Sequence, residues 1–243
     1  MKQHLYIITI FTAFLSCKKQ NEILNVIPLA DLYPIAVGNV FIYKLDSTFT
    51  KNFGKNLSTT SYHAKDTIES TFLDASGRRS FRIFRYTRDT LDKLEWAFAG
   101  TYFTTITQEK LETNDNNLRF ISLASPISYN TSWKGNAYIN TTLGTSPYAF
   151  LDNWSYQYQN INNSFVCLKG SLDSTTTVLQ QNYEVPESGF NRLQYCEKNY
   201  SIEVYAKGIG LVYKDFLHYV WQPSTAQFQE DSYGIRLNLI DYR

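Results

Sequence analysis

The chain has 243 residues and carries 23 Lys plus Arg against 22 Asp plus Glu, a formal net charge of +1. This balance argues against nucleic-acid binding and against a broad electrostatic attachment to anionic lipid, since both need an excess of positive charge. The length is ample for one core, and no Pro/Gly/Ser-rich linker divides the chain.

The first sixteen residues have the order of a bacterial export signal. Lys2 and His4 supply the charged start, and a nearly unbroken apolar run follows from Leu5 to Ser16. Because a membrane-spanning helix needs roughly twenty apolar residues, this run predicts a cleaved signal peptide over 1–16.

Cys17 follows directly, and Lys18 and Lys19 come after it. The segment Phe14-Leu15-Ser16-Cys17 resembles the lipobox of bacterial lipoproteins, although such boxes usually place Gly or Ala before the cysteine. The resemblance implies that Cys17 becomes the first residue and carries diacylglyceryl and acyl (palmitate-type) chains, which anchor a protein stably when two or more are present. Residues 17–30 then form a lipidated tether and 31–243 a single β-rich domain. An ordinary signal peptide with an incidental cysteine is the alternative.

Strand patterns dominate the remainder, which is rich in Tyr, Phe and Thr with polar clusters every ten to fifteen residues. The expected strands are 39–49, 61–72, 79–88, 94–108, 118–124, 154–161, 164–170, 175–185, 208–221 and 233–243. About ten strands with scarcely a helical period between them predict an all-β fold. We expect one antiparallel, strongly curved sheet or a half-closed or closed barrel, with a β-sandwich as the alternative.

The remaining cysteines, Cys167 and Cys196, form a pair in a compartment where disulfides persist. A bridge would close a loop of about 30 residues and contribute on the order of 3 to 4 kcal/mol. Two separate buried thiols are the alternative.

Motifs of known chemistry are absent from the sequence, including zinc, phosphate-loop, dinucleotide and nucleophile-elbow signatures. His63 and His218 lie far apart, so we predict no metal site and no cofactor. The carboxylate pairs Asp66/Glu69 and Asp89/Asp92 would suit glycoside hydrolysis only if the fold set their separation.

Five arginines fall between Arg78 and Arg88. On a strand Arg82 and Arg88 share one face and Arg79 and Arg85 the other, which favours cross-strand ion pairs over a one-sided phosphate-binding surface.

The tripeptide Asp-Ser/Thr-aliphatic or Thr occurs four times and resembles the O-glycosylation signal of exported Bacteroidota proteins. The candidate sites are Ser47, Thr67, Thr90 and Ser174. Capping of turns by the aspartate side chain is the alternative.

In "WSYQYQ", Trp154, Tyr156 and Tyr158 alternate with other residues and project from one face of a strand. They are our ligand-binding candidates if that face lines a groove; if it faces the core, the rings mainly stabilise the fold.

Several blocks together resemble a group of Bacteroidota envelope lipoproteins: "PIAVGNVFIYKLDST", "NNLRFISLASPI", "SWKGNAYIN", "YAKGIGLVYKDFLHYVWQP" and "YGIRLNLIDYR". The likeness covers most of the chain after Cys17, and the group carries no catalytic motif to transfer. The architecture is also similar to the half-barrel lipid carriers of the LolA and LolB kind.

These observations favour a non-catalytic envelope lipoprotein held in the membrane by its N-terminal lipid. We expect the periplasmic face of the outer membrane, because Lys18 and Lys19 stand where surface-exported proteins of this group carry acidic residues. An apolar ligand such as a lipid, a glycan or an envelope protein is the expected binding partner. A hydrolase whose residues converge only in the fold, and a structural envelope component, are the alternatives.

Overall fold

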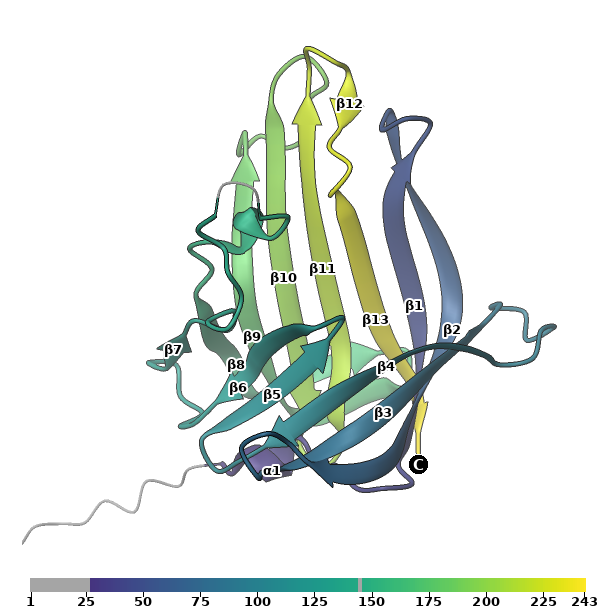
Figure 1. Cartoon of the computed structure of the whole chain (residues 1–243), viewed down its shortest axis with the longest axis vertical. Coiled ribbons are helices and arrows are strands. Elements are labelled where there is room, and N and C mark those ends of the chain that lie inside the picture. Colours follow the sequence, from purple (N-terminus) through teal and green to yellow (C-terminus); the bar gives the residue numbers. More distant parts are fainter. Residues whose placement is uncertain (1–26, 144–145) are drawn as a thin grey trace, which may run out of the picture.

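The computed structural model describes residues 27–143 and 146–243. It is 60% strand and 3% helix, and its one antiparallel sheet forms a nearly closed barrel of twelve strands (Figure 1). The predicted all-β fold with a single strongly curved antiparallel sheet is therefore confirmed. Cys17, the signal peptide and most of the predicted tether lie outside the described residues.

The strands of the first half of the chain follow a short helix, α1 (Leu29–Leu32). They are β1 (Val40–Lys51), β2 (Asn56–Leu73), β3 (Arg79–Arg88), β4 (Ala97–Ile106), β5 (Lys110–Asp115) and β6 (Leu118–Ala124). The second half has β7 (Ser132–Trp133), a 3₁₀ turn (Ala149–Leu151), β8 (Tyr156–Cys167), β9 (Gly170–Val185), β10 (Cys196–Ala206), β11 (Gly210–Gln222), β12 (Gln227–Phe228) and β13 (Tyr233–Tyr242).

The strand order around the barrel is β6-β5-β4-β3-β2-β1-β13-β11-β10-β9-β8-β7, with β12 paired only to β11. The chain therefore builds two runs of neighbouring strands, β1 to β6 and β7 to β13, and joins them where β1 pairs with β13. In Figure 1, β3 to β6 run obliquely across β10, β11 and β13. Residues from both groups line one interior cavity, so these strands face each other across the barrel.

Bulges curve the sheet enough to bring its two edges together. The β8–β9 ladder is interrupted between Gln159 and Asn163, where Asn160 and Asn162 have φ of 50° and 60°. Asparagine tolerates this left-handed conformation better than most residues, and each inserted residue bends and twists its strand.

The edge strand β6 meets β7, β8 and Gly135, which lies just after β7, through a seam made largely of side-chain hydrogen bonds. Tyr158 Oη donates to Ala124 O at 2.5 Å and accepts from Ala124 N at 2.9 Å. The Trp133 indole donates to Ile121 O at 2.8 Å, and Ile121 N donates to Gly135 O at 2.7 Å. These bonds satisfy backbone groups that an open sheet edge would leave unpaired.

α1 packs against one end of the barrel. Leu29 and Leu32 are almost fully buried and belong to the same core cluster as Trp154 and Tyr156. Asp31 O accepts a hydrogen bond from Gly208 N at 2.7 Å, which fixes α1 to the β10–β11 turn. Leu29 lies within the segment predicted as tether, so the folded body begins slightly earlier than residue 31.

The strand prediction needs three corrections. β5 and β10 lie outside the predicted strands, because KLETND is short and almost wholly polar and CEKNYSIEVYA opens with a polar segment, although apolar and polar residues alternate in it from Tyr200 onward. β8 is one strand where two were predicted, since its bulge at Asn160 and Asn162 resembles a turn in the sequence. The very short β7 and β12 carry no recognisable pattern.

The predicted disulfide is wrong, since both thiols are free and buried. Cys167 pairs with Gly170 at the start of β9, whereas Glu197, the neighbour of Cys196, pairs with Val185 at its end. β9 has 16 residues, so the two cysteines lie about 50 Å apart along the sheet. A disulfide needs Cα atoms within about 7 Å.

No helix in the described ranges is long and apolar enough to span a membrane.

Candidate functional site

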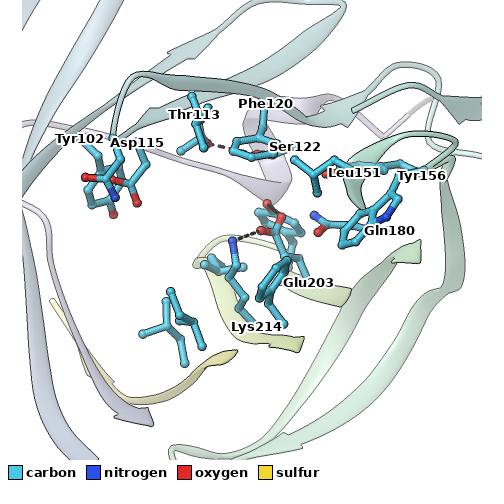
Figure 2. A pocket seen from close by; sticks show the side chains of 18 of the residues that line it. Tyr102, Thr113, Asp115, Phe120, Ser122, Leu151, Tyr156, Gln180, Glu203 and Lys214 are labelled. Carbon is cyan, nitrogen blue, oxygen red and sulfur yellow. Dashed lines mark hydrogen bonds and ion pairs between the residues drawn. The ribbon is translucent and has the colours of Figure 1, made fainter. Parts of the chain in front are cut away.

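The barrel encloses a cavity of about 210 Å³ between β3 to β6 on one side and β8 to β13 on the other (Figure 2). Aromatic rings make up much of its wall: Tyr33, Tyr102, Phe120, Tyr148, Trp154, Tyr156, Tyr205, Phe216 and Tyr233. Aliphatic residues complete the apolar part, namely Leu118, Leu151, Leu211, Ile235 and Leu237. The lining is thus mainly apolar with a few polar groups, which is the usual composition of a small-molecule site.

Glu203 and Lys214 form an ion pair inside this cavity. Lys214 Nζ lies 2.9 Å from Glu203 Oε1, and the Glu203 side chain is only 6% exposed. The second carboxylate oxygen accepts a hydrogen bond from Tyr205 Oη at 2.6 Å. Figure 2 shows the pair in the middle of the site, with Tyr102 and Asp115 on one side and Tyr156 and Gln180 on the other. Both oxygens of Glu203 are therefore engaged by the protein.

The pKa of Tyr205 is raised well above its ordinary value of 10, first by burial and then by the negative charge of Glu203. Tyr205 accordingly stays protonated and donates its hydrogen bond. Burial also raises the pKa of Tyr33 and of Tyr233, each to about 12. These phenols are hydrogen-bonding groups rather than bases.

A second ion pair places the guanidinium group of Arg85 on the opposite wall of the cavity. Arg85 donates to both oxygens of Asp66, at 2.7 and 2.6 Å, and Tyr102 Oη donates to Asp66 Oδ2 at 2.9 Å. Burial works against the charge of Arg85, but Asp66 more than offsets it and holds the pKa of the guanidinium well above its usual value. This is the cross-strand pairing expected for the arginine cluster.

The three predicted aromatic residues are all buried on one face of the chain, as their alternation implies. Trp154 and Tyr156 line the cavity, while Tyr158 serves the seam instead. Tyr156 packs edge-to-face on Trp133 with ring centroids 5.8 Å apart. The two interpretations of this aromatic face, that it packs in the core and that it lines a binding groove, are thus not exclusive, because these rings form the wall between core and cavity.

Sequence reasoning did not single out Glu203, Lys214 or Arg85 as site residues. The segment YSIEVYAK does alternate Ile202 and Val204 with Glu203 and Tyr205, which would have indicated a strand with a carboxylate on one face. Only the curvature of the sheet brings that face opposite Arg85.

His63 and His218 lie outside the cavity. His63 Nδ1 lies 2.7 Å from Asp92 Oδ1, on a carboxylate that is half exposed. His218 is buried, stacks on Phe150 with centroids 3.9 Å apart, and bonds Asn199 Oδ1 at 2.6 Å through Nδ1. Burial lowers the pKa of His218. Within residues 27–143 and 146–243, no group of three His, Cys, Asp or Glu side chains could hold a metal ion.

The carboxylate pairs considered for hydrolysis do not converge on the cavity. Asp66 pairs with Arg85, whereas Glu69 lies 3.8 Å from Arg82. Asp89 accepts hydrogen bonds from three backbone amides of its own turn, including Leu94 N at 2.7 Å. Asp92 pairs with His63 and with Arg88.

The four glycosylation candidates occupy different environments. Thr90 is exposed in the β3–β4 turn, whereas Ser47, Thr67 and Ser174 are half-buried within strands. The turn that contains Thr90 is capped by Asp89, as the alternative interpretation of the tripeptide predicts. Modification of these residues stays a prediction, and Thr90 is the most accessible of them.

No family model matches the chain, and no curated protein matches it. Among solved structures, a candidate lipoprotein from Parabacteroides distasonis is similar with a TM-score of 0.41 and 10% identity, covering 87% of this chain and 98% of the other. A candidate outer membrane lipoprotein-sorting protein domain from Vibrio parahaemolyticus gives a TM-score of 0.20 and 9% identity, covering 85% of each chain. The two descriptions name a lipoprotein and a lipoprotein-sorting domain. Neither similarity is close enough to assign a family or an activity.

Proposed function

We propose that this chain is a non-catalytic envelope lipoprotein that holds a small, mainly apolar ligand inside its barrel. The observation that carries the proposal is the aromatic cavity of about 210 Å³ between β3 to β6 and β8 to β13. The lipobox-like segment ending at Cys17 supports the anchor and the envelope location.

The charges in the wall disfavour an anionic ligand. Glu203 is matched by Lys214 and Asp66 by Arg85, and Asp115 lines the cavity as a further carboxylate, so the wall offers no surplus cation to an anion. An anionic ligand would have to break one of these pairs, and an unpaired buried charge costs several kcal/mol. A hydroxyl or carbonyl group can instead share the remaining donors.

The size favours a ring or a segment of a chain over a whole phospholipid. Drug-sized ligands fill pockets of roughly 300 to 1,000 Å³, and this cavity is smaller. Flat aromatic walls provide faces on which a sugar or sterol-like ring can stack. A glycan ring and an acyl segment are the two forms of the ligand to distinguish.

The test uses Thr113→Phe, which places a ring in the cavity from β5. The matched control is Thr71→Phe at an exposed position of β2. Purified full-length protein from its native host is extracted and the extract examined by mass spectrometry, and binding of the neutral apolar dye N-phenyl-1-naphthylamine is titrated.

We expect ligand and dye to be retained by the parent and the control and lost in Thr113→Phe. If the parent yields no ligand and binds no dye, the binding proposal fails. If instead a hydrolysed glycan accumulates with the parent and not with Glu203→Gln, the hydrolase alternative is correct.

The anchor is tested by Cys17→Ala, a position outside the described residues. We expect the mutant to lose outer-membrane retention and the wild type to resist protease added to intact cells, as a protein on the periplasmic face does. Equal retention of the mutant would refute the lipid anchor, and cleavage of the wild type in intact cells would place it on the cell surface.

A further inference from the structure

The outer surface of β2 to β6 contains a second hollow, separate from the barrel interior. Its volume is about 440 Å³, and the β2–β3 turn forms part of its rim. Three arginines line it, Arg78, Arg82 and Arg119, together with the carboxylates of Asp74 and Glu112. None of these residues lines the barrel cavity.

Glu112 is the centre of this cluster. Its side chain is 3% exposed, yet three cations contact it: Lys110 at 2.9 Å, Arg78 at 2.9 Å and Arg119 at hydrogen-bond distance. Burial would raise the pKa of Glu112, but hydrogen bonds from Lys110, Arg78 and Arg119 lower it to about 2. One buried carboxylate therefore holds together three cations that would otherwise repel each other.

The cluster carries more positive than negative charge. Arg78, Arg82, Lys110 and Arg119 supply four positive charges, whereas the negative charges come from Glu112, from Asp74, which pairs with Arg78 at 2.6 Å, and from Glu69, which is 3.8 Å from Arg82. One positive charge is left over. The negative partner at the centre is buried, while the Arg82 and Arg119 side chains are 42% and 36% exposed. The hollow thus presents guanidinium groups to solvent above a hidden carboxylate.

Aromatic rings hold two of these guanidinium groups. The Arg119 guanidinium carbon lies 4.3 Å from the centroid of Tyr138, and that of Arg82 lies 5.6 Å from Phe72. Stacking fixes the plane of a guanidinium and leaves its edge donors free to bind an anion in a fork. Arg119 uses its Nε and one Nη group on Glu112, so its other Nη group remains for a ligand.

We propose that this hollow, lined by Arg78, Arg82 and Arg119 above Glu112, is a binding site for a phosphate group. Planar, pre-oriented arginines match the bidentate geometry of phosphate oxygens, which makes such contacts stronger than those between neutral groups. The phosphate group belongs either to a free phosphate ion or to a phospholipid headgroup. The hollow is too polar for the apolar ligand of the barrel interior.

The test is calorimetric titration of the purified full-length chain with two probes, inorganic phosphate and dihexanoyl phosphatidic acid. Arg82→Gln should weaken phosphate binding about tenfold, because a hydrogen bond to a charged group is lost while the fold keeps every contact around Glu112. Lys169→Gln is the control, since it also removes one positive charge, but from the surface pair with Asp241. We expect it to leave binding unchanged.

Glu112→Gln gives the opposite and more specific expectation. It removes the internal counter-charge, so phosphate should bind about tenfold more tightly and should raise the melting temperature of this variant more than that of the parent. A purely structural salt-bridge network would be weakened by the same change without gaining affinity for phosphate.

Tighter binding of dihexanoyl phosphatidic acid than of inorganic phosphate would identify a lipid headgroup as the source, and equal binding a free phosphate. Absence of binding by both probes to the parent, or equal binding by Arg82→Gln and the parent, would overturn the proposal.

Discussion

Gly135 is the position where a single added methyl group should reveal how tightly the seam is packed against the cavity wall. A Cβ atom at Gly135 would lie 2.1 Å from Cε2 of Tyr156 and within 2.4 Å of two further ring atoms. Non-bonded carbon atoms need about 3.5 Å or more, so the ring or the loop must move. Gly135 is glycine here because of this close approach.

The ring of Tyr156 has few directions in which to move. It is 1% exposed and packs against Trp133. The Gly135 backbone is also fixed, since its carbonyl accepts from Ile121 N across the seam. The remaining space is the cavity, which Tyr156 lines. Overpacking of this kind costs about 1 to 3 kcal/mol. For a domain of this size that lowers the melting temperature by roughly 2 to 12 °C.

The control is Gly100→Ala in β4, where an added Cβ meets no atom within 4 Å. It should leave the free energy of unfolding nearly unchanged or raise it slightly, because alanine restricts the unfolded chain. Urea denaturation followed by tryptophan fluorescence measures both variants. Gly135→Ala should also weaken binding of the neutral dye. If the two variants are equally stable and bind dye equally, the assigned contact between Gly135 and Tyr156 is wrong.

Three further predictions concern the seam, the thiols and the buried carboxylate. Tyr158→Phe removes the hydroxyl that hydrogen-bonds to Ala124 N and O, so it should lower the free energy of unfolding by about 1 to 3 kcal/mol and speed hydrogen exchange of the β6 amides. Tyr62→Phe, at an exposed position, should change neither quantity. Cys167 and Cys196 should both react with an alkylating reagent in urea without any reductant, and labelling only after reduction would contradict the strand register. The pKa of Glu112 is about 2 in the folded chain against an ordinary value of 4.5. The ionised carboxylate therefore stabilises the fold above pH 4.5 by on the order of 3 kcal/mol. This stabilisation is lost as the pH falls from 4.5 toward 2. Denaturant melts across this range should show the loss in the parent, and a Glu112→Gln variant with the same acid sensitivity would refute the assignment.

The sequence by itself determined the class of the fold, because alternation of side chains is a local property of a strand. Trp154, Tyr156 and Tyr158 are buried together as their spacing predicts. The arginine cluster likewise divides between two faces, with Arg85 inside the barrel and Arg82 outside. β10 was missed because buried polar residues such as Asn199, Ser201 and Glu203 give it the pattern of a surface segment.

Only the tertiary structure decided which residues share a site, because register and curvature set distances that the sequence does not contain. Cys167 and Cys196 are the two cysteines that remain after Cys17, which suggests a disulfide, but they lie in β8 and β10 beside opposite ends of β9. Glu203 and Arg85 lie more than a hundred positions apart and line one cavity, since the sheet curls back on itself. Arg119, remote from the arginine cluster in sequence, joins Arg78 on the same buried carboxylate. Local alternation in the sequence predicts which face of the sheet a side chain occupies, and the closure of the sheet determines which residues it contacts.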